Sequence, residues 1–253
     1  MQTILVCEDS FEGILTGIYE AYERKLSHDD VIIETGGEEN FRLFSEYIEI
    51  KADEEKAVKV SRSLRRMLGD EVVYDLHNAL ASEDTERGNA VYHTVVEALN
   101  GKGRNVMSYL QNDSVRKVFE LSRNVWVEIH HMYGFLRFEE LEGGILYAAI
   151  APKNNIISRL MPHFSDRFPL ENFVIYDEKR DIYAIHPAKG QWFLVREQDM
   201  DDRTEVRVSE GEGRMQELFK SFVRTIAIES RTNEKLQLNM LPLRFRPYMT
   251  EFR

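Results

Sequence analysis

The chain has 253 residues, of which 43% are hydrophobic, so it is long enough to bury a core in one large domain or two smaller ones. A formal net charge of −11 excludes a protein that coats DNA or membranes unspecifically, so any nucleic-acid contact requires a local basic patch. Cys7 is the only cysteine, which excludes an intramolecular disulfide and a cysteine-rich metal cluster.

The N-terminal part shows strand and helix patterns in alternation. We expect β-strands at three short apolar runs, TILVC (3–7), VIIET (31–35) and EYIEIK (46–51). Ser10 can cap a helix after the first run, and Asp53 precedes a stretch whose apolar residues recur at helical spacing. The polar, glycine-containing NGKGRN (100–105) is typical of a linker. The sequence therefore predicts a mixed strand and helix part at 1–103 and a second part at 104–253.

The second part begins with a long helix and then changes its period. NDSVRKVFELSRNVWVEIHHMYG (112–134) opens on a capping residue and reaches Gly134, where a helix would stop. Two hairpins are predicted, one at FLRFEELEGGILYAAIAP (135–152) and one at FVIYDEKRDIYAIHP (173–187). A helix is predicted between them at NNIISRLMPHFSDRF (154–168), and one more strand follows at QWFLVRE (191–197). The predicted fold class is α+β: a helical and mixed N-terminal part, then an antiparallel sheet of two hairpins plus a further strand with helices packed on it.

An amphipathic helix is predicted near the C-terminus. Its apolar residues recur three and four positions apart, at Met215, Leu218, Phe219, Phe222, Val223 and Ile226. The preceding DMDDRTE (199–205) is predicted to be a solvated loop. Residues 1–60 carry a net charge of −9 and residues 214–253 one of +4, so we expect any DNA to meet the C-terminal half.

Familiar catalytic motifs are absent from the sequence. Neither spacing of a glycine-rich phosphate loop occurs, and G-x-S-x-G is missing. His130 and His131 point about 100° apart on a helix, so they cannot easily hold one ion together, and we expect no metal and no other cofactor. His131 and His163 remain candidate acid–base residues if folding brings Glu139 or Asp177 near them. No run reaches the roughly 20 apolar residues of a membrane span, and no signal peptide is recognisable, so a cytoplasmic protein is expected.

Basic and aromatic residues alternate in three places, GFLRF (134–138), PHFSDRF (162–168) and LRFRPY (243–248). Arginine holds phosphates and exposed rings stack on unpaired bases, so this pattern is typical of contact with nucleic acid. The candidate contacts are Arg137, Phe138, Arg167, Arg244, Arg246 and Tyr248. The alternative is ordinary strand alternation, which would bury the rings in the core.

Motifs along nearly the whole chain resemble one known family. They are SFEGILTGIYEAYERK (10–25), GFLRFEEL (134–141), LYAAIAP (146–152), MPHFSDRFP (161–169), FVIYDEKR (173–180) and IAIESRTNEKLQLNMLPLRFRPYMTEF (226–252). Together they are similar to DNA metabolism and repair proteins that accompany a radical-SAM DNA repair protein. In some members the C-terminal part resembles an extension of a uracil-DNA-glycosylase-like domain. The resemblance also matches Arg180 and Arg231, which join the candidate nucleic-acid contacts.

Three functions follow from these observations. The resemblance implies an accessory protein of DNA repair that binds a radical-SAM DNA repair protein, single-stranded or damaged DNA, or both, through a basic aromatic surface. The second is a nucleic-acid-processing enzyme that uses His131 and His163 for acid–base chemistry. The third is a protein-interaction scaffold without nucleic-acid contact, and its mark would be a large exposed apolar patch without a basic cleft.

Overall fold

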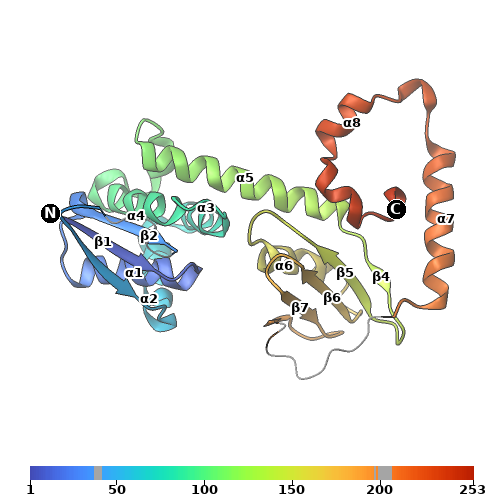
Figure 1. Cartoon of the computed structure of the whole chain (residues 1–253), viewed down its shortest axis with the longest axis horizontal. Coiled ribbons are helices and arrows are strands. Elements are labelled where there is room, and N and C mark those ends of the chain that lie inside the picture. Colours follow the sequence, from blue (N-terminus) through green and yellow to red (C-terminus); the bar gives the residue numbers. More distant parts are fainter. Residues whose placement is uncertain (37–41, 197, 199–206) are drawn as a thin grey trace. The chain divides into compact units, whose positions relative to one another are not determined.

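The computed structural model describes residues 1–36, 42–196, 198 and 207–253. The solvated loop predicted at 199–205 lies outside these ranges. By its contacts the chain divides into two units, Met1–Val127 and Glu128–Arg253, and each unit has a β-sheet of its own (Figure 1).

The first unit is built on a parallel sheet with the strand order β2-β1-β3. Its strands are β1 (Gln2–Cys7), β2 (Val31–Thr35) and β3 (Ser45–Ile50), as the apolar runs predict. Its helices are α1 (Phe11–Glu23), α2 (Glu54–Leu68), α3 (Asp70–Ala81) and α4 (Arg87–Glu97). Strands β1 and β2 are parallel because α1 carries the chain back between them.

Helix α1 is fixed to the sheet by local features of its sequence. Ser10 caps the helix, since its Oγ accepts the backbone N–H of Gly13 at 2.9 Å. Gly17 lets the helix approach β1 closely, because a Cβ at this position would overlap Cys7 Sγ. One continuous core of buried side chains joins the sheet to the helices, with Leu5, Ile14, Ile33, Leu76 and Tyr92 among its members.

The boundary between the units lies elsewhere than the sequence predicts. The polar stretch at 100–105 forms a π-helical turn, η2 (Ala98–Lys102), and enters a 3₁₀ turn, η3 (Gly103–Ser108), whose Val106 is completely buried in the first unit. Helix α5 (Asp113–Phe135) adds Val115 and Val118 to the same core. Glycines and polar residues therefore mark a turn inside the first unit, and the division falls within α5.

The second unit contains a mixed sheet with the strand order β4-β5-β6-β7-β8. Its strands are β4 (Glu139–Glu140), β5 (Leu146–Ile150), β6 (Phe173–Asp177), β7 (Ile182–His186) and β8 (Phe193–Arg196). Its helices are α6 (Ile157–Arg167), α7 (Glu210–Ile226) and α8 (Glu234–Met240), followed by the 3₁₀ turns η6 (Leu243–Tyr248) and η7 (Thr250–Phe252). Phe173, Ile175 and Ala184 are buried on one face of this sheet, and α6 contacts β7.

The α+β class is confirmed, but the sheet that the sequence predicts is wrong in part. The second hairpin exists, since β6 and β7 pair in antiparallel fashion, and β8 adds to β7 as predicted. Strands β5 and β6, however, are parallel, because α6 returns the chain across the sheet between them. The first hairpin is reduced to the pairing of a two-residue β4 with β5, because α5 runs on through Gly134 to Phe135 and residues 136–138 form no strand.

Candidate functional site

The two candidate catalytic histidines have different surroundings in the second unit. The ring of His131 stacks on Phe135, with the centroids 5.5 Å apart, and meets the edge of Phe245 at 5.6 Å. The ring of His163 stacks on Tyr133 at 4.0 Å. Residues 131 and 133 point about 200° apart on a helix, so His131 lies on one side of α5 while His163 packs against the other side, and the two do not form one acid–base pair.

The surroundings of His131 disfavour the protonated form of its imidazole ring. Burial lowers its pKa below the usual 6.5, and the nearby Arg244 guanidinium and His130 lower it further, while Glu128 acts in the opposite direction. Its Nδ1 is buried and has no hydrogen-bond partner in the described part of the chain. The neighbours of His131 therefore pack around its ring, as in a core, more than they orient it by hydrogen bonds, as a general base would require.

Three of the six arginines expected to hold phosphate are paired with carboxylates. Arg137 donates to Glu251 at 2.8 Å, Arg180 to the fully buried Asp177 at 3.0 Å, and Arg244 lies 3.2 Å from Glu128. The pKa of Asp177 is raised because burial outweighs the opposing effect of Arg180. These three guanidinium groups are consequently neutralised within the fold.

The remaining predicted contacts are arranged in several other ways. Arg167 and Arg246 lie over the rings of Phe168 and Phe252, at 5.8 and 4.9 Å from the centroids. Phe138 packs edge-on against Phe164, Phe168 and Phe173 inside the unit, as the alternative interpretation predicts. Tyr248 donates its hydroxyl hydrogen to Glu178 at 2.6 Å, and Arg231 is exposed in a short 3₁₀ turn, η5 (Glu229–Arg231). Apart from Arg231, each of these side chains therefore contacts a carboxylate or an aromatic ring of the same unit.

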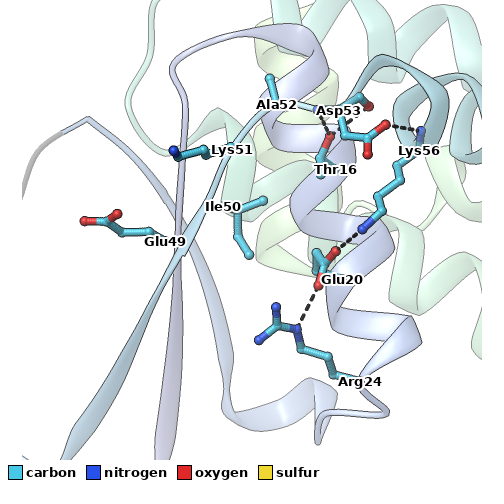
Figure 2. A pocket seen from close by; sticks show the side chains of 9 residues that line it. All are labelled: Thr16, Glu20, Arg24, Glu49, Ile50, Lys51, Ala52, Asp53 and Lys56. Atoms are coloured by element: carbon cyan, nitrogen blue, oxygen red, sulfur yellow. Dashed lines mark hydrogen bonds and ion pairs between the residues drawn. The ribbon is translucent and has the colours of Figure 1, made fainter.

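A polar pocket of about 220 Å³ lies in the first unit, beside the edge strand β3. It is lined by Thr16, Glu20, Arg24, Glu49, Ile50, Lys51, Ala52, Asp53 and Lys56. Figure 2 shows Ile50 on the side of α1, whereas Glu49 and Lys51 turn to the other side. Three acidic and three basic side chains therefore border this pocket.

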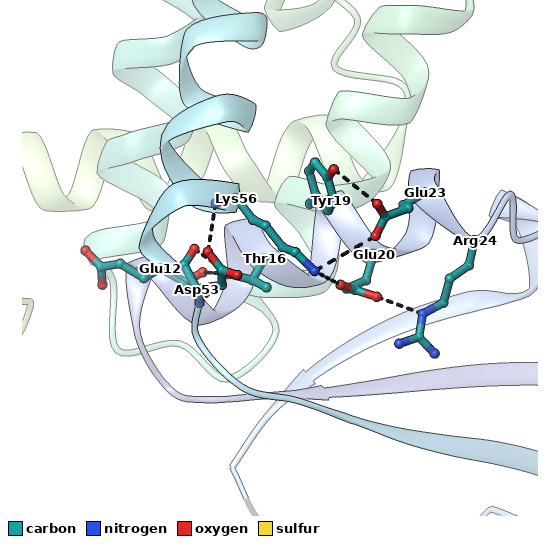
Figure 3. Close-up of polar contacts among 8 residues, drawn as sticks. All are labelled: Glu12, Thr16, Tyr19, Glu20, Glu23, Arg24, Asp53 and Lys56. Atoms are coloured by element: carbon teal, nitrogen blue, oxygen red, sulfur yellow. Dashed lines mark hydrogen bonds and ion pairs between the residues drawn. The ribbon is translucent and has the colours of Figure 1, made fainter.

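Three of these six charged side chains, those of Glu20, Arg24 and Lys56, are paired with one another, as Figure 3 shows. The buried carboxylate of Glu20 accepts from Lys56 Nζ at 2.5 Å and from Arg24 Nε at 2.8 Å. These contacts, that of Lys56 first, hold the pKa of Glu20 below its usual range. Thr16 Oγ1 accepts the backbone N–H of Asp53 at 3.0 Å. The network thus fastens α1 to the start of α2, and we interpret this pocket as structural.

Helix α7 presents the opposite situation, an apolar surface without a cover. Its apolar stripe consists of Met215, Leu218, Phe222 and Ile226, whose exposed fractions are 62, 56, 57 and 57%. Phe219 of the same helix is less exposed, because Arg137 lies over its ring at 6.0 Å, and α7 contacts η7. Leu236 and Met240 of α8 are also exposed, at 57 and 67%. Large side chains exposed in such numbers are typical of a surface that binds another molecule.

Two features of the second unit cannot be predicted from the sequence. The amphipathic period of α7 predicts its helix, but the exposure of the apolar stripe depends on what packs against it. Glu128 is almost completely buried and organises the start of α6, and no motif around it indicates this role. Among the described residues, no helix has the length and hydropathy of a membrane span, and no three metal-ligating side chains lie close enough to hold an ion.

These features define an α+β protein of two units, in which three of the candidate arginines of the second unit are paired with carboxylates and an apolar face of α7 is exposed. Residues 85–251 match the model of DUF4130, a domain of unknown function, and the chain belongs to this family. No curated protein matches the chain. The matched range begins just before α4, so the family domain includes the last part of the first unit as well as nearly all of the second. The family carries no assigned activity, and the resemblance to repair-associated proteins stays a prediction.

Proposed function

We propose that this chain is an accessory protein of DNA repair that binds a protein partner through α7 and α8, and that the partner is a radical-SAM DNA repair protein. The observation that carries the proposal is the apolar stripe of α7. The identity of the partner rests on the resemblance in sequence alone.

The stripe supports protein binding for a physical reason. Burial of a large apolar side chain contributes about 1.5–3 kcal/mol, so four half-exposed side chains on one helix represent a considerable driving force for association. Both ends of the segment are held by the second unit, because Val208 forms a β-bridge with Leu141 and Phe245 is buried against His131. An anchored helix loses less conformational freedom on binding than a free one.

The pairing of arginines argues against a role as a general nucleic-acid binder. A phosphate would have to displace Glu251, Asp177 or Glu128 from their arginines, and the last two carboxylates are buried. The enzymatic alternative has no comparable support, since His131 lies on one side of α5 and His163 packs against the other. Of the three functions that the sequence suggests, protein binding is the one that the geometry favours.

The test is a pull-down of a radical-SAM DNA repair protein from the same organism with the full-length chain. Leu218→Asp places a charge in the apolar stripe and should abolish the interaction. Leu170→Asp is the matched control, because Leu170 is a leucine of the same unit that is 64% exposed and lies outside the stripe. The proposal fails if the wild-type chain does not retain the partner, or if both variants retain it equally.

A further inference from the structure

We infer that the surface that binds the apolar stripe is itself acidic: a protein surface with an apolar centre and carboxylates at its border. This inference rests on the proposed function and adds the chemistry of the partner. It comes from the charged residues next to the stripe.

Two cations next to the exposed apolar residues have no carboxylate partner among the described residues. Arg214 precedes Leu218 by one helical turn and borders the stripe, and Lys235 precedes Leu236 at the start of α8. Neither takes part in a salt bridge, whereas Lys220, farther around α7, pairs with Glu217 at 3.3 Å. The ion pairs of the second unit therefore leave unpaired positive charge beside the stripe, at Arg214, and beside the exposed Leu236 of α8, at Lys235.

The opposite side of α7 provides a comparison within the same helix. Arg224 is also without a carboxylate partner in the described part of the chain, but it lies two positions from Phe222 and points about 200° away from it. A partner seated on the stripe would meet Arg214 and leave Arg224 in solvent. A comparison of variants at these two arginines thus distinguishes a local contact with the partner from an effect of the overall charge.

A protein is the occupant that these observations favour. Nucleic acid would use the cations but would leave four large apolar side chains in water. A membrane surface prefers a helix with excess positive charge, and in α7 the charges of Glu210, Glu212 and Glu217 balance those of Arg214, Lys220 and Arg224. A second copy of the chain would bring the same unpaired cations into one symmetric interface, where they repel each other.

Two peptides test this chemistry without the natural partner. Each is an amphipathic helix of roughly 20 residues with a leucine stripe, which is bordered by glutamates in one peptide and by lysines in the other. Binding to the full-length protein is measured by fluorescence anisotropy in low and high salt. We expect the glutamate peptide to bind, more weakly in high salt, and the lysine peptide not to bind.

Three variants locate the contact. Arg214→Glu and Lys235→Glu should each weaken the binding of the glutamate peptide roughly tenfold. Arg224→Glu makes the same change of charge and should weaken this binding about twofold or less. The inference is overturned if both peptides bind equally, if neither binds, or if Arg224→Glu matches Arg214→Glu. It is also overturned if sedimentation shows self-association that Leu218→Asp abolishes, or if single-stranded DNA binds and Arg214→Glu prevents it.

The same variants are then measured against the radical-SAM protein. If the glutamate peptide binds as described but the radical-SAM protein does not, the inference stands and the proposed function fails. If the radical-SAM protein binds with equal strength to wild type, Arg214→Glu and Lys235→Glu in low and high salt, the proposed function stands and the inference fails.

Discussion

Replacement of Glu128 by alanine should destabilise the second unit severely. The carboxylate is 1% exposed, and it accepts the backbone N–H groups of Lys153 and Asn154 at 2.9 Å each and the side-chain amide of Asn154 at 2.7 Å. Alanine would leave these donors without an acceptor in a site that is mostly closed to water. Each buried donor that loses its partner costs about 1–3 kcal/mol, so we expect a loss of about 3–9 kcal/mol for the three donors together.

By the same reasoning, the contact of Glu128 with Arg244 contributes much less to the stability of the second unit than the three hydrogen bonds do. The Arg244 side chain is 46% exposed, and solvent screens a charge in that position. Arg244→Met should therefore cost about 1 kcal/mol or less, provided that the three hydrogen bonds of Glu128 hold its charge. The comparison separates the backbone donors from the ion pair as the source of stability.

Urea unfolding measures both variants in a Trp126→Phe background, where Trp192 is the remaining tryptophan and reports on the second unit. Hydrogen exchange of the amides of Lys153 and Asn154 gives an independent value for the same region. A loss below about 1 kcal/mol in Glu128→Ala, or an equal loss in Arg244→Met, would refute the reasoning, because the three donors would then not depend on the carboxylate.

Three more predictions concern single sites. Lys56→Met should lower the melting temperature at neutral pH and flatten the acid limb of the profile of melting temperature against pH. The lowered pKa of Glu20 stabilises the fold above the unfolded pKa of this group, and this stabilisation is lost as the pH falls through the folded pKa. An unchanged acid limb contradicts this prediction. Gly17→Ala should cost about 1–3 kcal/mol in urea unfolding through overlap with Cys7 Sγ, and the loss should be smaller in a Cys7→Ala background; additive losses would exclude the overlap. His131→Phe should remove the loss of stability that wild type shows as the pH falls below about 6.5, since a lowered histidine pKa disfavours the protonated fold. If the melting temperature falls by the same amount between about pH 7.5 and 5.5 in the variant and in wild type, this role of His131 is rejected.

The local elements of the first unit follow directly from sequence patterns. Ser10 and Asp53 begin their helices where capping residues predict them, and the three apolar runs become the three strands. These features depend on residues within a few positions of one another. The second hairpin, with its turn between β6 and β7, is local in the same sense.

Contacts between residues that are distant in sequence decide the other features of the fold and of the site. Arg137 and Glu251 are 114 positions apart, and Glu128 and Asn154 are 26 positions apart, so no local pattern can indicate either contact. For the same reason basic and aromatic alternation predicts a nucleic-acid surface, while the folded chain uses Arg137, Arg180 and Arg244 in ion pairs. The parallel pairing of β5 and β6 likewise depends on the path that α6 takes across the sheet.

The sequence by itself determined where most helices and strands form, because periodicity and caps act within one or two turns. It also determined that α7 has an apolar side. Only the tertiary structure decided that this side faces solvent, that Arg137, Arg180 and Arg244 have carboxylate partners and that the division of the chain falls within α5. The physical reason is that exposure and ion pairing depend on which remote segments occupy the space beside a residue, and this is settled only when the whole chain has folded.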